Sequence, residues 1–476
     1  MKTQHTLIAL AVLGMGAAAQ AAPLSPADAL TATNAGTAVY VSGSSALRFS
    51  MASGFVSMCQ AGTIAVFGNT NGSAAPGNNV RGYACTLAKD IKPSTGGSTA
   101  FSAGTNVVFN KYDAGGSING IQPLVKNTQL AYLSYGACTP TGLVRSGTFD
   151  LTKIDYSCTQ GNNVVPQMGV SDVEAATIQH RNNLAAGTTA VVTSGLNGGP
   201  HSVAMAGVAV NLPLYRALQV AQGLNQDDTE ASAPTLPIGF LSTVLTGTAS
   251  PLLDTGFTTV IPGSESAGHA INLCTRANGS GTKAMVNSFL LNNPCSTAGA
   301  QPAGTNSPNA SVGEIGNNDM VLNVATSTGN VIACMQAAST DSTMTSTGLS
   351  KTWAIGIVGS ENDPGIGGTD AGWRFVKVGG FLPNQANGRV GAYPMTFENY
   401  MYWPKTGLAA KFSQFANWLQ KDAVTPLALS ATPDAGTRKG ILAIADVTDP
   451  TFASVTGYIA RTTRSGNSCS PQQIVQ

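Results

Sequence analysis

The stretch Thr275-Arg276-Ala277-Asn278-Gly279-Ser280-Gly281-Thr282 joins a short apolar run to a segment with helical periodicity. Upstream, residues 270–274 (Ala-Ile-Asn-Leu-Cys) predict a buried strand. Downstream, apolar residues between 284 and 290 recur at helical spacing until Pro294 ends the pattern. The stretch is therefore predicted to be a strand-to-helix turn, the repeating unit of an α/β fold.

The composition of this turn suits an anion. Backbone N–H groups at a helix N-terminus carry partial positive charge, and Gly279 and Gly281 let the chain approach a ligand closely. Ser280 and Thr282 add hydroxyl donors, and Arg276 adds a planar guanidinium fork. The same residues also fit a plain helix N-cap at Ser280 with glycines that serve only the turn.

Two earlier segments repeat the strand, small-residue loop and helix pattern. Residues 37–41 predict a strand, and Ser-Gly-Ser-Ser-Ala at 42–46 precedes a helix face that extends to Met58. Residues 106–109 predict another strand, followed by a small-residue turn with Ser117 near the start of a helix. A further strand, which ends at Asp172, would deliver that carboxylate at the carboxyl end of a sheet, where α/β proteins bind ligands. A local turn cap explains Asp172 equally well.

The N-terminus predicts export. Lys2 and an apolar run from Thr6 to Ala19, followed by Ala19-Gln20-Ala21, have the pattern of a secretory signal cleaved after Ala21. No cysteine follows that would accept a lipid, and no later apolar run approaches the roughly 18 residues needed to span a bilayer. We expect a periplasmic or secreted chain of about 450 residues, without membrane insertion and long enough for two or three domains.

The balance of charges bears on the class of partner. Lys2 is one of 24 basic residues, so the chain after the signal has 23 basic and 23 acidic residues and no net charge. A neutral chain does not suggest binding to nucleic acid or to an anionic membrane surface. Charged residues make up only 10% of the sequence, which fits an exported, loop-rich surface.

The cysteines predict disulfides rather than a metal site. There are eight, an even number, and no C-x-x-C motif occurs. In an exported chain this favours four disulfides, and sequence alone does not fix their connectivity. Pairing of neighbours predicts three of them: Cys59 with Cys85, Cys138 with Cys158, and Cys274 with Cys295.

Strands and helices alternate on both sides of about residue 200, which indicates two α/β lobes. We expect lobe I to begin with residues 22–200 and lobe II to span residues 201–380. Residues 381–476 would return to lobe I, with a strand over 397–403 and an amphipathic helix from Leu408 to about Asp422.

Taken in this order, the motifs resemble those of the phosphate-binding proteins of ABC phosphate transporters, a branch of the type 2 periplasmic binding-protein family. Arg276 with Gly279–Thr282 is the most specific match. The other matching segments are Ser42–Ala46, Tyr112–Ile121, Gly169–Asp172, Val208–Pro213, Ala354–Gly356 and Tyr393–Pro394.

The resemblance implies a two-lobed fold with a hinge and an interlobe cleft that closes on a tetrahedral oxyanion, together with disulfide-stabilised insertions. It implies a binding protein rather than an enzyme, with no catalytic residue, metal or cofactor, and with an ABC permease as a partner if one exists. The implied ligand-binding residues are Ser44, Ser45, Ala46, Ser117, Asp172, Arg276, Ser280, Gly281 and Thr282. Within this set Asp172 is the only carboxylate, and the amides, the hydroxyls and Arg276 can all donate. An ionised Asp172 would accept the proton that phosphate carries at neutral pH, and would reject sulfate, which has none.

Several features depart from the family pattern. The segment between Cys138 and Cys158 is an insertion, residues 296–313 form a Pro/Gly/Ser/Asn-rich loop, and residues 114–118 lack part of the expected small-residue run. A secreted phosphatase on the same fold and an extracellular structural or adhesive protein therefore remain alternatives. Residues 263–269 approach a serine-hydrolase motif, but Ser264 stands where the first glycine is required. The acidic, glycine-rich stretch 363–370 misses the spacing of a calcium loop.

Overall fold

The computed structural model describes residues 22–69, 79–145, 149–184, 187–247, 269–303, 313–315, 320–338, 350–364, 372–424, 440–444 and 458–475. The predicted signal segment, the hydrolase-like stretch 263–268 and most of the acidic stretch 363–370 lie outside these ranges. Within them, every helix is too short or too polar to cross a membrane.

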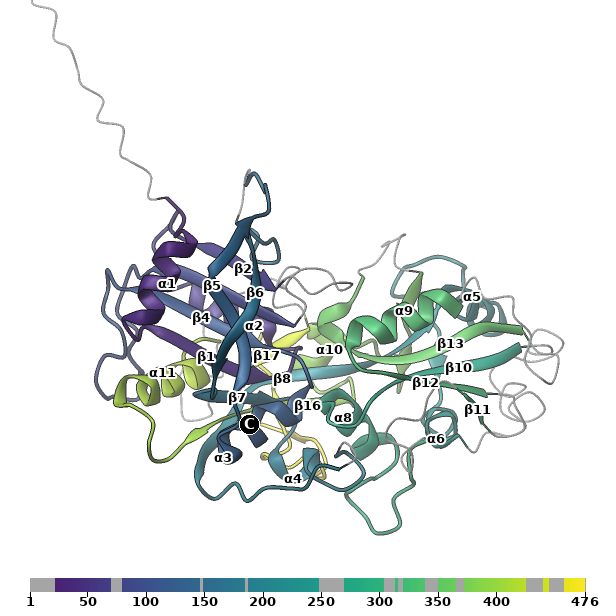
Figure 1. Ribbon diagram of the computed structural model, residues 1–476. Helices are drawn as coiled ribbons and strands as arrows, with labels where there is room; N and C mark the ends of the chain where they lie inside the picture. The colour runs from purple at the N-terminus through teal and green to yellow at the C-terminus, as the bar shows by residue number, and fades with distance from the viewer. Residues whose placement is uncertain are drawn as a thin grey trace, which may run out of the picture.

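The fold is mixed α/β, built on one large curled sheet (Figure 1). The elements that precede the longest strand are α1 (Pro26–Asn34), β1 (Ala38–Gly43), α2 (Arg48–Val56), β2 (Ala65–Asn69), β3 (Val80–Thr86), β4 (Asn106–Tyr112), η1 (Ser117–Gly120), α3 (Gln122–Lys126), β5 (Leu130–Pro140), β6 (Tyr156–Val164), β7 (Met168–Ser171) and α4 (Ala175–Ile178). The longest strand, β8 (Leu196–Asn211), and the elements after it are α5 (Leu212–Ala221), β9 (Thr235–Leu236), α6 (Ile238–Thr246), β10 (His269–Arg276), α8 (Gly281–Leu290), β11 (Gly313–Ile315), β12 (Met320–Ala325), α9 (Thr328–Ala338), β13 (Ser350–Gly359), η4 (Ser360–Asn362), β14 (Trp373–Phe375), β15 (Lys377–Val378), α10 (Gln385–Arg389), β16 (Thr396–Pro404), α11 (Ala410–Lys421), β17 (Ile441–Ala443), β18 (Thr462–Thr463) and β19 (Gln473–Ile474).

β8 joins two half-sheets. The 15-stranded sheet has the order β11-β12-β10-β13-β8-β16-β7-β1-β4-β3-β2-β6-β5, with β14 and β17 also paired to β8. β8 pairs with β16 from Leu196 to Met205 and with β13 from Ala206 to Val210. We call the strands from β16 to β5 the first half-sheet and those from β13 to β11 the second. The lobe boundary predicted at residue 200 falls inside β8, which belongs to both.

Parallel strands in each half-sheet end at a common edge. β1 runs parallel to β4 and β7, and β10 runs parallel to β12 and β13. Because parallel strands present their carboxyl ends on the same side, the residues that follow β1, β4 and β7 gather at one edge of the first half-sheet. The residues that follow β10, β12 and β13 gather in the same way at an edge of the second.

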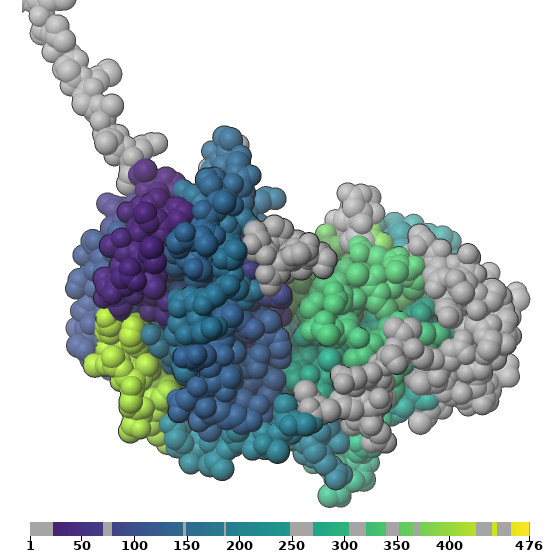
Figure 2. Space-filling view, in the orientation of Figure 1, coloured from purple at the N-terminus to yellow at the C-terminus, as the bar shows by residue number. Residues whose placement is uncertain are grey.

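One apolar core reaches both half-sheets, from Val173 and Phe397 to Ile271, and other cores lie within a single half-sheet. In the first half-sheet, α2 and α11 pack on β1 and β4, with Phe55, Phe109 and Phe415 fully buried. In the second, the core includes Ile271 of β10 and Ile355 of β13, and α9 covers another face of the same strands (Figure 1). In the space-filling view the two parts are in contact, and the end of the β5–β6 hairpin projects from the first (Figure 2).

The cysteines form four disulfides, and one predicted pair is wrong. Cys59–Cys85 and Cys138–Cys158 are confirmed, and the second joins β5 to β6, so the predicted insertion is the outer end of this hairpin. Cys274 bonds to Cys334 instead of Cys295. The reason is that Cys274 on β10 is buried against α9, which carries Cys334, whereas Cys295 lies beyond the far end of α8.

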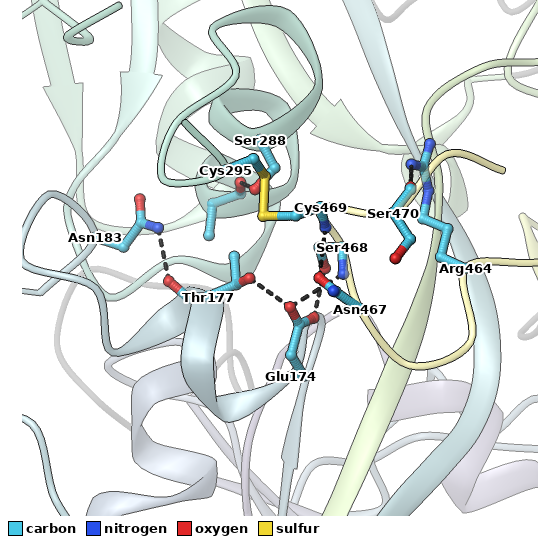
Figure 3. The surroundings of a disulfide bond; sticks show 11 residues. Glu174, Thr177, Asn183, Ser288, Cys295, Arg464, Asn467, Ser468, Cys469 and Ser470 are labelled. Carbon is cyan, nitrogen blue, oxygen red and sulfur yellow. Dashed lines mark hydrogen bonds between the residues drawn. A yellow bond between two sulfur atoms is a disulfide. The ribbon is translucent and has the colours of Figure 1, made fainter. Parts of the chain in front are cut away.

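Cys295 bonds to Cys469 in the C-terminal segment, 174 positions along the chain (Figure 3). That segment is also held by Glu174, whose carboxylate accepts from the backbone N–H of Ser468 at 3.0 Å and from its hydroxyl at 2.5 Å. Thr177 donates to the same carboxylate at 2.5 Å. The disulfide therefore links the chain after α8 to the C-terminal segment. That segment also bonds to Glu174, which is two residues beyond Asp172.

Candidate functional site

Asp172 follows β7 and is the centre of a buried polar cluster. Its carboxylate accepts hydrogen bonds from the hydroxyl groups of Ser44 and Thr282, the latter at 3.5 Å. The Asp172 backbone N–H donates to Oγ of Ser117 at 3.2 Å. Asp172 is only 4% exposed and the other three residues are also buried, so these polar groups satisfy one another away from solvent. Residues from three loops and one helix N-terminus thus meet at a single point.

Gly281 lies at the closest approach of α8 to this cluster. A Cβ atom at this position would stand 2.6 Å from Cβ of Asp172 and in contact with Oγ of Ser117. The preceding Gly279 has φ +91°, a left-handed conformation that glycine adopts without strain. Its carbonyl accepts from the backbone N–H of Ile118 at 3.2 Å. The glycines of the turn therefore allow α8 to direct its N-terminus at Asp172 and Ser117.

Ser280 is the N-cap of α8. Its hydroxyl accepts from the backbone N–H of Lys283 at 3.3 Å, and its own side chain is buried. Lys283 donates to Oδ1 of Asn278 at 2.8 Å, and burial lowers the pKa of Lys283 to about 8. The capping role that the sequence suggested for Ser280 is confirmed, and this hydroxyl also stands at the helix end that faces Asp172.

Arg276 is the last residue of β10, and its hydrogen bonds within the described part of the chain go to residues outside this cluster. Its Nη1 donates to Oγ1 of Thr328 at 2.8 Å, and its Nη2 to the carbonyl of Thr326 at 3.5 Å. Nε is buried and has no hydrogen-bond partner in the described part of the chain. Burial lowers the pKa of Arg276, while the negative charges of Asp172 and Glu361 act in the opposite direction. The charge of Asp172 therefore affects the pKa of Arg276 although the two side chains do not form an ion pair.

Residues 42–46, which we call the first loop, contribute one side chain to the cluster and one backbone contact that supports it. Ser44 reaches Asp172, and the backbone N–H of Ala46 donates to Oγ of Ser44 at 3.2 Å. Ser45 is half-buried, and its carbonyl accepts from the backbone N–H of Arg48. Of the nine predicted residues, Ser44, Ser117, Gly281 and Thr282 meet at Asp172. Ala46 supports Ser44, Ser280 caps α8, and Ser45 and Arg276 make no hydrogen bond to Asp172 within the described residues.

Lys111 on β4 braces the first loop and was missed at the sequence level. Its fully buried Nζ donates to the carbonyls of Gly43 and Ser44 at 3.0 and 2.9 Å, and pairs with Asp113 at 2.6 Å. Arg48 also pairs with Asp113, at 2.5 Å. Burial lowers the pKa of Lys111, and Asp113 opposes this shift. The sequence does contain a signal for this contact: Lys111 and Asp113 stand at the end of β4 in a chain with few charged residues.

Glu361 was also missed. It follows β13 within η4, and Oε2 of its carboxylate is buried and lacks a hydrogen-bond partner among the described residues. Burial, with a smaller contribution from Asp172, raises the pKa of Glu361 to about 7, and Arg276 opposes this shift. Two carboxylates and one guanidinium therefore act on one another at the junction of the half-sheets. No group of His, Cys, Asp or Glu suited to a metal ion occurs in the described ranges.

Comparisons with known proteins give distant structural likeness only. No family model and no curated protein sequence matches the chain. One similar structure is an ABC-type phosphate transport receptor from Vibrio cholerae, with a TM-score of 0.29 and 12% identity over 55% of this chain and 77% of that chain. Another, from Clostridium perfringens, is described as a phosphate ABC transporter substrate-binding protein with bound phosphate; its TM-score is 0.38, with 11% identity over 82% of this chain and 97% of that chain. PstS from Borrelia burgdorferi has a TM-score of 0.27 and 12% identity over 55% and 78% of the two chains. At these values the likeness does not assign the chain to a family.

Proposed function

We propose that this chain is an exported solute-binding protein that captures inorganic phosphate or a related tetrahedral oxyanion between its two half-sheets. The two half-sheets would act as lobes joined by a hinge at β8, and closure would bury the ligand. The protein would pass its ligand to a membrane permease. Four disulfides support export, because such bonds persist in oxidising compartments.

The observation that carries the proposal is the meeting of Ser44, Ser117 and Thr282 at Asp172. Two hydroxyls from opposite half-sheets already donate to a carboxylate at this point, and one of them, that of Thr282, lies in the first turn of α8. A tetrahedral oxyanion offers four oxygens to the same kinds of donor. Asp172 would then accept from the hydroxyl group of the ligand, and Arg276 would offset the charge of Asp172 and of the anion.

The test is a calorimetric titration of the purified protein with phosphate, sulfate and a phosphate monoester. We expect saturable binding of one phosphate per chain and at least tenfold weaker binding of sulfate, because Asp172 would face an oxygen with no proton to share. An absence of saturable binding to all three ligands would refute the proposal. Steady release of phosphate from the ester would favour the phosphatase alternative, since a binding protein returns its ligand unchanged.

A further inference from the structure

Glu361 lies at the edge of the second half-sheet that carries the candidate site. Gly356 on β13 pairs with Cys274 on β10, two residues before Arg276, and the two strands are parallel. The chain that leaves β13 at Gly359 therefore emerges at the edge where Arg276 lies. The hydroxyl of Ser360 donates to the carbonyl of Gly440 at 3.1 Å, and a Cβ on Gly440 would stand 2.5 Å from the backbone nitrogen of Glu361. These contacts hold the Glu361 backbone in place.

Two buried polar atoms at this edge lack partners. Oε1 of Glu361 accepts from Nδ2 of Asn362 at 2.8 Å, but Oε2 has no partner in the described part of the chain. Nε of Arg276 is likewise buried and unpartnered. Leaving a buried donor or acceptor unsatisfied costs roughly 1–3 kcal/mol, and more when the group is charged. An acceptor and a donor of this kind, close enough to act on each other electrostatically, indicate a position that a small polar ligand completes.

The charges around Glu361 come from both half-sheets. Asp172 acts from the end of β7, and Arg276 acts from the end of β10. β8, which packs against η4, has no charged residue between Ser202 and Asn211. Asp363 is two residues further along the chain, and Gly440 and the strand β17 that follows it are uncharged. Arg276 is therefore the one cation that offsets the two acids Asp172 and Glu361 in this set of groups. Burial raises the pKa of Glu361 to about 7.

We propose that Glu361 is a second acid of the oxyanion site, which contacts the bound anion directly and makes its affinity depend on pH. In its protonated form Glu361 donates a hydrogen bond to an oxyanion oxygen, so that Asp172 accepts from the ligand and Glu361 donates to it. In its ionised form it adds a second negative charge that repels the ligand. Above neutral pH, Glu361 must then take up one proton from solvent when the anion binds. This inference rests on the proposed function.

The experiment compares the wild-type protein with Glu361→Gln, which keeps a donor of the same size but cannot ionise. Inorganic phosphate is titrated by calorimetry at pH 5.5 and pH 8.5. The two proteins should bind phosphate within about twofold at pH 5.5. At pH 8.5 the variant should bind about thirtyfold more tightly than wild type, because each pH unit above a pKa near 7 costs the wild type tenfold. The ligand's own titration is common to both proteins and cancels in the ratio.

Glu230→Gln is the matched control, because the carboxylate of Glu230 is exposed and bonds only to Asn384. It should follow wild type at both pH values. An equal ratio of wild-type to Glu361→Gln affinity at pH 5.5 and pH 8.5 would overturn the role of Glu361 while leaving phosphate binding intact. Failure of both proteins to bind phosphate at any pH would instead overturn the proposed function together with this inference.

A second measurement covers the case in which Glu361→Gln does not fold. Infrared difference spectroscopy of the wild-type protein at pH 8.5 should show the carbonyl stretch of a protonated carboxyl group appearing when phosphate is added. Phosphate itself has no band of this kind. Absence of that band upon saturating binding would contradict the inference.

Discussion

The hydroxyl group of Ser44 donates a hydrogen bond to Oδ1 of Asp172, although the two residues are 128 positions apart in the sequence. Ser44 follows β1 and Asp172 follows β7, and these strands are parallel neighbours in the first half-sheet. Across the junction, Thr282 of α8 donates to the other oxygen of the same carboxylate. Asp172 is therefore one point at which side chains from both half-sheets meet, and the predictions below start from it.

Replacing Asp172 with asparagine should reduce selectivity rather than abolish binding. Asparagine keeps an oxygen for Ser44 but replaces the other acceptor with a donor, which sulfate can use. The ratio of phosphate to sulfate affinity should fall by about 10- to 100-fold, the effect of removing one unsatisfied buried group. Competition titrations of both anions measure this ratio. Asp227→Asn is the control, because this carboxylate accepts from Thr229 in a loop outside the site. An unchanged ratio in Asp172→Asn would remove Asp172 from ligand selection.

Truncation of Arg276 should remove most of the phosphate affinity. Losing a buried charged partner costs 2–5 kcal/mol or more, so the Kd of Arg276→Ala should rise by at least about 30-fold. Arg276→Lys should fall between wild type and Arg276→Ala, because lysine keeps the charge but cannot hold Thr328 and the ligand with one planar fork. Calorimetry on folded proteins measures all three values. Equal affinity in wild type and Arg276→Ala would exclude Arg276 from the site.

Gly281→Ala should destabilise the fold and weaken phosphate binding together. The added methyl group would enter the space of Asp172 and Ser117, and overpacking of this kind costs about 1–3 kcal/mol. Gly239→Ala in α6 is the matched control, because nothing lies within 4 Å of its Cβ position and alanine favours a helix. Thermal melts should show Gly281→Ala below wild type and Gly239→Ala at or above it. A Gly281→Ala protein with wild-type stability and affinity would contradict the close packing of α8 on the cluster.

Removal of the Cys295–Cys469 disulfide should cost more stability than removal of Cys138–Cys158. On the loop-entropy model, closing 174 residues stabilises by about 5 kcal/mol, and closing 20 residues by about 3 kcal/mol. The paired serine variants at each disulfide can be compared by denaturant unfolding. The Glu174–Ser468 contacts should keep the C-terminal segment in place in the Cys295/Cys469 variant. A larger loss from the Cys138/Cys158 variant would contradict the loop-length argument.

His201 should make stability depend on pH. It lies in β8, is 1% exposed, and neither ring nitrogen has a hydrogen-bond partner among the described residues. Burial lowers the pKa of His201 from 6.5 to about 4, so between these values the unfolded chain binds a proton that the folded chain does not. The His201 contribution to stability should therefore be lost as pH falls from 6.5 towards 4, by about 2–3 kcal/mol at pH 4.5.

Glu361 acts in the opposite sense, because its folded pKa is raised from 4.5 to about 7 and its contribution is lost as pH rises through that range. The measurement must therefore compare wild type with His201→Leu at each pH. Relative to that variant, wild type should lose stability between pH 7 and pH 4.5 in denaturant unfolding. A difference that stays constant over this range would show that His201 can be protonated in the folded protein.

The sequence by itself determined the local units of this protein. Apolar runs and helical spacing located β1, β10, β13, β16, α8 and α11, because each of these depends on residues close together in the chain. Glycine and hydroxyl residues identified the loops at 42–46, 112–121 and 275–282, and the strand end at Asp172. The run Trp373–Val378 forms two short strands, β14 and β15, because β14 pairs with β8 and β15 pairs with β9.

Only the tertiary structure decided which of these units meet. Cys274 lies on the face of β10 that α9 covers, and it therefore bonds to Cys334 of α9. The path of the C-terminal segment brought Cys469 to Cys295. The parallel register of β13 and β10 brought Glu361 to the sheet edge where Arg276 lies. The pairing of β4 with β1 placed Lys111 against the carbonyls of Gly43 and Ser44. Contacts of this kind depend on strand order and on which face a side chain occupies, and neither is encoded in a local pattern of residues.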